Sequence, residues 1–246
     1  MFKKVMKVTA IVVGCLVLVV GGFFGWFFYQ MRDLKPLDTA QISDSISVIK
    51  GGMGNLYLVK NNDGYVAFDA ADNPKKLLEG LQVLSIDPSK VKAVFLTHSD
   101  ADHVDGLVVF PSAKVYLSKD EVPLLKEKTY RHFLGMTHMN KLPVAEYTTL
   151  SDGDSIVIDG ITINAIAAPG HTQGSMCYSV GDALFVGDLC TIVDDQVRPM
   201  LKIFTEDMTI NAESIKKVAK LNSYKTIYTA HCGYTKDLNK ALEAWR

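Results

Sequence analysis

Four side chains of metal-binding type lie within six consecutive residues, in the segment His98-Ser99-Asp100-Ala101-Asp102-His103. The segment follows the apolar run Val91 to Leu96, which we expect to form a buried strand. Imidazole nitrogens and carboxylate oxygens are ligands that a borderline divalent ion such as Zn²⁺ accepts. A polar turn with a helix-capping Asp is the alternative, but it explains one such residue better than four. The cluster therefore predicts a metal-binding loop at the edge of a β-sheet.

Three later residues of metal-binding type also stand where a β-rich run ends. His171 follows the run 161–167, Asp188 follows 183–186, and His231 follows 226–230. Glycines beside them permit tight backbone turns. We therefore expect these three side chains to converge with the early cluster on one metal site.

Taken in order, these motifs resemble those of the metallo-β-lactamase superfamily. The matching segments are Thr97-His98-x-x-x-Asp102-His103, Pro169-Gly170-His171-Thr172, Gly187-Asp188 and Ala230-His231, and the resemblance covers residues 42–246. It implies an α/β (α+β) fold, an αββα sandwich with a two-metal site at one edge. It also implies that His98, Asp100 and His171 hold one ion, that Asp102, His103 and His231 hold the other, and that Asp188 bridges them.

Asp100 departs from the family's usual pattern, which has a second histidine at this position. Some lineages, including certain competence-related membrane proteins, look like they use this His-x-Asp-x-Asp-His version. A carboxylate adds negative charge and makes the first site harder, which shifts its preference toward Mn²⁺ or iron relative to an imidazole-rich site. We therefore expect one or two ions, Zn²⁺ at the second site and Zn²⁺, Mn²⁺ or iron at the Asp100 site.

The amino-terminal segment has no charged residue from Val8 to Met31 and is almost wholly apolar to Tyr29. At about 1.5 Å per helical residue it is long enough to cross the hydrocarbon core of a bilayer. Lysines precede it, which favours a cytoplasmic amino terminus. A cleaved signal peptide would have a shorter core and a small-x-small exit. We expect a cytoplasmic end (1–7), an uncleaved single-pass anchor in the cell membrane (8–30), a linker (31–41) and an extracytoplasmic hydrolase domain (42–246).

Charge argues against a nucleic-acid partner. Beyond residue 7 the chain has 23 basic and 27 acidic residues, a net charge of about −4 with His neutral. This part therefore lacks the basic footprint of a nucleic-acid binder. We expect a small-molecule substrate and contact with membrane lipid through the amino-terminal helix, and the sequence leaves the oligomeric state open.

The metal ligands predict the chemistry. A bound dication lowers the pKa of a coordinated water to about 7, so a metal-bound hydroxide can attack without a nucleophilic side chain. Asp102 would orient this hydroxide and Asp188 would bridge the ions, which makes both candidate catalytic residues. The expected function is hydrolysis of a small ester, lactone, lactam or thioester. Two alternatives remain open: a phosphodiesterase or nuclease of the same fold, suggested by Asp100, and a non-catalytic metal-binding module.

Only 15 residues follow His231 in the sequence, which disfavours the glutathione-thioester hydrolases that append a helical domain. The sequence pattern also predicts the secondary structure of the domain. Strands are expected at 45–50, 55–60, 65–70, 91–96, 114–117, 144–149, 155–158, 161–166, 176–180 and 183–186. Helices are expected at 75–84, after strand 114–117 through about 128, at 211–221 and near the carboxyl terminus. The stretches 122–147 and 191–208 are expected to be surface loops, with a lid over the metals as the alternative.

Overall fold

The computed structural model describes residues 2–133 and 136–246 and divides the chain into two compact units, one ending at Leu34 and one from Lys35 to Arg246. The first unit is dominated by one long helix, α1 (Phe2–Met31). Its stretch Ile11–Met31 is long and apolar enough to cross a membrane, with a mean hydropathy of 2.5. The expected apolar amino-terminal helix is therefore present.

In the second unit the described residues form two large sheets and two hairpins. The first sheet, in spatial order, contains β1 (Ala40–Gln41), β2 (Ile46–Lys50), β3 (Asn55–Lys60), β4 (Tyr65–Phe68), β5 (Val91–Phe95), β6 (Lys114–Ser118) and β9 (Thr148–Leu150). The second contains β10 (Ser155–Ile158), β11 (Ile161–Ala167), β12 (Met176–Val180), β13 (Ala183–Gly187), β16 (Thr226–Thr229) and β17 (Gly233–Thr235). The separate hairpins are β7 (Arg131–Phe133) with β8 (Met136–His138), and β14 (Cys190–Val193) with β15 (Gln196–Pro199).

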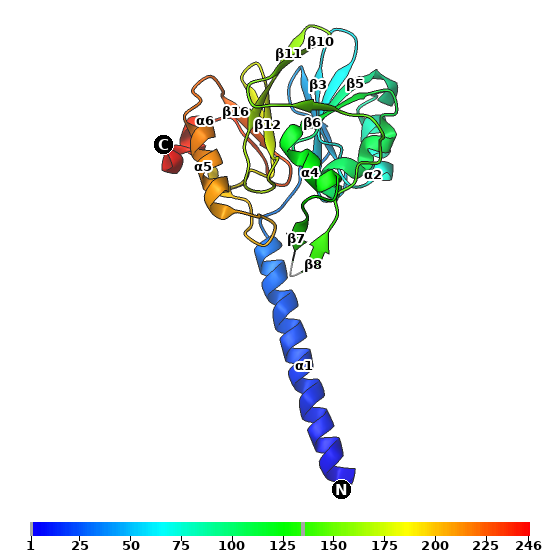
Figure 1. Cartoon of the computed structure of the whole chain (residues 1–246), viewed down its shortest axis with the longest axis vertical. Helices are drawn as coiled ribbons and strands as arrows, with labels where there is room; N and C mark the ends of the chain where they lie inside the picture. Colours follow the sequence, from blue (N-terminus) through cyan, green and yellow to red (C-terminus); the bar gives the residue numbers. More distant parts are fainter. Residues whose placement is uncertain (1, 134–135) are drawn as a thin grey trace. The chain divides into compact units, whose positions relative to one another are not determined.

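Helices cover the outer face of each sheet (Figure 1). On the side of the first sheet lie α2 (Pro74–Val83), α3 (Ala101–Val104) and α4 (Val122–Leu125), with the 3₁₀ turns η1 (Pro88–Lys90), η2 (Asp105–Val109) and η3 (Lys119–Glu121). On the side of the second lie α5 (Met208–Ala219), α6 (Leu238–Ala241) and η4 (Glu243–Trp245). The layers are helix, sheet, sheet, helix, which confirms the αββα sandwich.

Strand periodicity explains why both faces of each sheet are buried. Along β13, Phe185 points into the core between the sheets, whereas Leu184 and Val186 pack against the helical layer that contains Ile215 of α5. In the core between the sheets the Phe68 and Phe185 rings are stacked at 4.0 Å. Continuous apolar runs such as 91–96 are therefore required, because a strand with helices on one face and a sheet on the other is covered on both.

The direction of the strands places the functional loops. Strand β5 is parallel to both of its neighbours, β4 and β6, and β13 is parallel to β16. The carboxyl ends of parallel strands meet at the same edge of a sheet, and the residues that follow them can share a site. The segments carrying His98, Asp188 and His231 all begin at such strand ends.

Most expected elements are confirmed within one or two residues, and the differences have local causes. The helix expected to reach about 128 ends at Leu125, because Glu127 adopts a positive φ of 57°. The strand expected at 144–149 occupies Thr148–Leu150 instead. Helix α5 begins at Met208, earlier than expected, because the Asp207 side chain caps it by accepting hydrogen bonds from the Thr209 and Ile210 amides. The two expected surface loops contain the hairpins β7–β8 and β14–β15.

Candidate metal centre

The loop after β5 delivers the first four candidate ligands. His98 lies just beyond the strand end, and Asp100 stands at the N-cap position of the short helix α3. The first turn of α3 then carries Asp102 and His103. The loop and the first turn of α3 thus bring two candidate ligands of each metal position to the same edge of the sandwich.

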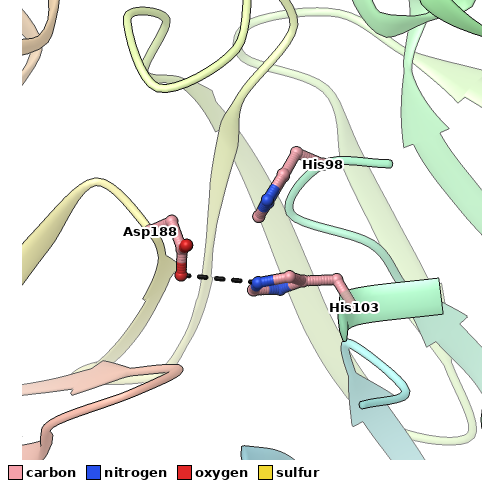
Figure 2. A group of neighbouring side chains, drawn as sticks. All are labelled: His98, His103 and Asp188. Atoms are coloured by element: carbon pink, nitrogen blue, oxygen red, sulfur yellow. Dashed lines mark ion pairs between the residues drawn. The ribbon is translucent and has the colours of Figure 1, made fainter. Parts of the chain in front are cut away.

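The seven predicted site residues are brought together in two groups that share Asp188. The first ligand group is His98, Asp100 and His171, and the second ligand group is Asp102, His103 and His231; in each group the potential ligand atoms lie within 4.8 Å of one another. His98, His103 and Asp188 also meet this criterion together (Figure 2). The residues are buried, except that Asp100 and Asp102 are partly exposed.

The second ligand group has the spacing of a tetrahedral zinc site. His231 Nε2 lies 3.1 Å from Asp188 Oδ1 and 3.4 Å from Asp102 Oδ2. His103 Nε2 lies 3.4 Å from Asp188 Oδ1 and 3.7 Å from Asp102 Oδ2. Two ligand atoms that each lie 2.0–2.2 Å from a tetrahedral ion are separated by about 3.3–3.6 Å. The four separations lie within or close to this range, so the spacing of these side chains is compatible with one tetrahedral ion.

The potential ligand atoms of the first ligand group are separated by similar distances. The Nε2 atoms of His98 and His171 are 3.1 Å apart. Asp100 Oδ2 lies 3.5 Å from the former and 3.3 Å from the latter. A further side chain, Arg131 of β7, reaches into this group, with its Nη2 at 3.2 Å from His171 Nε2.

Asp188 faces both groups with different oxygens. Its Oδ1 contacts the second group, whereas its Oδ2 lies 3.6 Å from His171 Nε2 in the first. The preceding Gly187 has a φ of +51°, and a Cβ at that position would overlap with the Thr97 side chain. Glycine is therefore required here on both conformational and steric grounds.

Oxygen atoms lie close to the Nδ1 atoms of His103 and His231, on the side of each ring away from Nε2. The Nδ1 atom of His103 lies 2.9 Å from Asp69 Oδ2, and that of His231 lies 2.9 Å from the Met53 carbonyl oxygen. Asp69 in turn accepts hydrogen bonds from the Thr97 amide and hydroxyl at 2.8 and 3.0 Å. A carboxylate or carbonyl on Nδ1 is the usual arrangement that leaves Nε2 free for a metal.

Glu121 joins the two loops that carry the first ligand group. This fully buried carboxylate accepts hydrogen bonds from the Ser99 amide and hydroxyl at 2.9 and 2.7 Å. Its other oxygen accepts from the Thr172 hydroxyl at 2.7 Å and the Gly174 amide at 3.1 Å. One buried negative charge is thus balanced entirely by donors from two segments that are far apart in the sequence.

The carboxylates dominate the electrostatics of the second group. Burial alone would lower the pKa of His231, but Asp188 and Asp102 raise it to about 9. Burial would raise the pKa of Asp188, yet His231 and His103 hold it well below its ordinary value. In the first group, by contrast, burial and the neighbouring His98 lower the pKa of His171 to about 4. Asp188 and Asp102 therefore favour positive charge at His231, whereas burial and His98 disfavour it at His171.

Unsatisfied polar atoms show that the second group fits a metal ion. Among the described residues, His103 Nε2 and Asp188 Oδ1 are buried without a hydrogen-bond partner, and both face the same point. Buried polar atoms without partners are costly, and a bound cation would satisfy both. Borderline nitrogen donors with carboxylate oxygens suit Zn²⁺.

A cleft opens beside the ligands. Its volume is about 500 Å³, which lies within the range of small-molecule sites. Asp100, Asp102 and Arg131 line it together with residues of the segment 138–141. Asp102 thus belongs both to the second ligand group and to the wall of the cleft.

The sequence pattern did not identify Asp69 or Glu121 as part of the site, and it placed Arg131 only within the expected surface loop 122–147. Asp69 directly follows β4, which is parallel to β5. The same signal that pointed to His98, a polar residue where a parallel strand ends, would have found it. A buried Glu within the helical segment 119–125 has no comparable signal, because charged residues in short helices are usually exposed.

Comparison with known proteins agrees with this geometry. The family model of the metallo-beta-lactamase superfamily matches residues 49–231. The probable polyketide biosynthesis zinc-dependent hydrolase BaeB of Bacillus velezensis is 29% identical over 174 residues, 68% of this chain and 66% of the relative. A hydroxyacylglutathione hydrolase of Aeromonas hydrophila is 28% identical over 137 residues, 54% of this chain and 45% of the relative. The chain thus spans about half to two thirds of these relatives.

Solved structures share the fold. A B3 metallo-beta-lactamase with an active-site glutamic acid superposes with a TM-score of 0.66 at 19% identity, covering 89% of this chain and 91% of that one. A metallo-beta-lactamase family protein from Thermus thermophilus gives a TM-score of 0.60 at 20% identity, covering 78% of this chain and 72% of that one. Since the family model matches most of the chain, the chain belongs to the metallo-beta-lactamase superfamily.

Proposed function

We propose that this chain is a membrane-anchored, zinc-dependent hydrolase that acts on small esters, lactones, lactams or thioesters. The observation that carries the proposal is the second ligand group, where two unsatisfied buried atoms and two further ligand atoms surround one point beside a cleft. The names of the relatives support zinc and a small-molecule substrate.

The positions of these residues assign each of them a role in binding the metal or in activating water. His103, whose Nδ1 lies beside the Asp69 carboxylate, and His231, whose Nδ1 contacts the Met53 carbonyl, would hold Zn²⁺ together with Asp102 and Asp188. When bound, Zn²⁺ lowers the pKa of a coordinated water to about 7 and polarises the oxygen of the bond under attack. Asp102 lines the cleft, so its carboxylate is placed to orient the attacking water and to accept its proton.

A substrate panel tests this function. The full-length chain in detergent, loaded with Zn²⁺, would be assayed on an ester, a lactone, a β-lactam, an acylglutathione and bis(p-nitrophenyl) phosphate. We expect turnover of at least one acyl substrate and its loss on treatment with a chelator, because the proposed chemistry requires the ion. Hydrolysis of the phosphodiester alone would assign the protein to the phosphodiesterases instead. Bound metal without turnover of any substrate would indicate a binding module.

We further propose that α1 is an uncleaved membrane anchor with the domain on the extracytoplasmic side. The helix has a long uncharged core, and the lysines at positions 3, 4 and 7 precede it. Positive residues stay on the cytoplasmic side of a span.

Fractionation of cells tests the anchor. The protein should remain with membranes after carbonate extraction, and protease added to spheroplasts should digest the domain. Intact mass should correspond to a chain that begins at or next to residue 1. A mature chain that begins within α1 or after it would refute the anchor, and protection of the domain from protease would reverse its orientation.

A further inference from the structure

Arg131 lies where the first ligand group would hold its ion. It is the first residue of β7, in a hairpin outside both large sheets, and its side chain is only 9% exposed. Its Nη2 lies 3.2 Å from His171 Nε2 and 2.7 Å from Asp100 Oδ2. A zinc ion bound by His171 would lie about 2.1 Å from the same nitrogen. The guanidinium therefore competes with an ion for the same ligand atoms.

The guanidinium is fixed in this position by all three of its nitrogens. Nε and Nη2 donate to the two oxygens of Asp100, a bidentate pairing. Nη1 donates to the His171 carbonyl oxygen at 2.6 Å, and Nη2 also donates to the Phe204 carbonyl oxygen at 2.8 Å. Glu206 adds an ion pair to Nη1 at 3.3 Å. These partners fix the position of the guanidinium next to the ligand atoms of the first group.

Both carboxylate oxygens of Asp100 accept hydrogen bonds from side chains. Besides Arg131, its Oδ1 accepts a hydrogen bond from the Asn140 side chain at 2.8 Å. Its negative charge is thus already balanced by the guanidinium. A dication placed between Asp100 and His171 would have to break these bonds and would lie beside a fixed positive charge.

The second ligand group has no such cation. Within residues 2–133 and 136–246, the ion pairs of Asp102 and Asp188 are all with histidines. Among the described residues, His103 Nε2 and Asp188 Oδ1 are unsatisfied there. In the first group the unsatisfied atom is His171 Nδ1, whereas the Nε2 atom of His171 contacts His98 and Arg131. The two groups therefore differ in whether a fixed cation already contacts the potential ligand atoms.

We propose that Arg131 takes the place of the first metal ion, so that the protein binds a single Zn²⁺ at the second ligand group and Asp100 is the counter-ion of Arg131. The proposal rests on the zinc site of the proposed function. It makes Arg131 a positioning residue, which holds His171 and the loop of Asp100 in the places that an ion would otherwise fix.

Metal stoichiometry tests the proposal without an activity assay. The untagged full-length chain in detergent would be saturated with Zn²⁺, desalted and analysed for zinc per chain. We expect one equivalent for the wild type and two for Arg131→Ala, because that substitution frees the ligand atoms of the first group. Arg198→Ala, an exposed arginine paired with Asp194, is the matched control and should keep one equivalent. Cobalt loading should report the same numbers through its absorption spectrum.

A second variant keeps the test sharp if Arg131→Ala does not fold. Asp100→Asn retains shape and hydrogen bonding, and we expect it to keep one equivalent, because Asp100 is not a ligand in this proposal. Two equivalents in the wild type, or a fall from one to none in Asp100→Asn, would overturn the role of Arg131 while leaving the hydrolase proposal intact. No zinc in the wild type would overturn both.

Discussion

Asp102→Ala is expected to lower kcat/KM by about three orders of magnitude or more, while the fold is retained. Asp102 supplies one oxygen of the second ligand group and also lines the cleft, so the substitution removes a ligand and the proposed proton acceptor together. Loss of about 4 kcal/mol of transition-state stabilisation corresponds to a thousandfold in rate. The measurement is steady-state kinetics on the panel substrate that the wild type hydrolyses best.

Asp63→Ala is the matched control for this loss. Asp63 is 70% exposed and pairs only with the surface lysines Lys90 and Lys92 among the described residues, far from the ligands in the β3–β4 turn. Exposed pairs of this kind contribute little, so its kcat/KM should stay within about twofold of the wild type. If Asp102→Ala kept more than about a tenth of the wild-type rate, the catalytic site would have to lie elsewhere.

Glu121→Ala is expected to lower the free energy of unfolding of the domain by about 3 to 5 kcal/mol. The substitution leaves the buried amides of Ser99 and Gly174 without an acceptor, at a cost of about 1–3 kcal/mol each, and it creates a cavity. For a domain of this size the melting temperature should fall by roughly 10 °C. Thermal unfolding followed by near-ultraviolet circular dichroism of the full-length chain measures this.

Glu213→Ala separates this effect from the mere loss of a glutamate. Glu213 on α5 is 66% exposed and pairs only with Lys216 in the described structure, so its removal should change the melting temperature by no more than about 1–2 °C. Equal stability of Glu121→Ala and Glu213→Ala would mean that Glu121 does not hold the two loops together.

The αββα fold followed from the resemblance to the superfamily, whereas the positions of the candidate ligands followed from the strand pattern. Parallel strands buried on both faces leave continuous apolar runs, and polar residues directly after such runs must lie at the strand ends. His98, Asp188 and His231 were found in this way, and the structure brings them together. Whether all seven residues bind metal remains a prediction.

What the sequence could not predict depends on tertiary contacts between distant segments. Arg131 lies 31 residues after Asp100 in a stretch without regular periodicity, so nothing local indicated that the two would pair. Glu121 likewise finds its partners in two separate loops. A charged side chain becomes buried only where the fold supplies its counter-charge or donors, and that information is spread over the whole chain.

The division of the ligands between the two sheets has a consequence for the assembly of the domain. His98, Asp102 and His103 follow a strand of the amino-terminal half, whereas Asp188 and His231 follow strands of the carboxyl-terminal half. An ion bound by residues of both halves would link the two sheets. Because only the folded domain would bind it, its binding would increase the free energy of unfolding. At a free concentration of a hundred times Kd this amounts to about 2.7 kcal/mol. The urea concentration at the midpoint of unfolding, measured with and without the ion, would therefore show whether the metal site is occupied. This measurement does not require a known substrate.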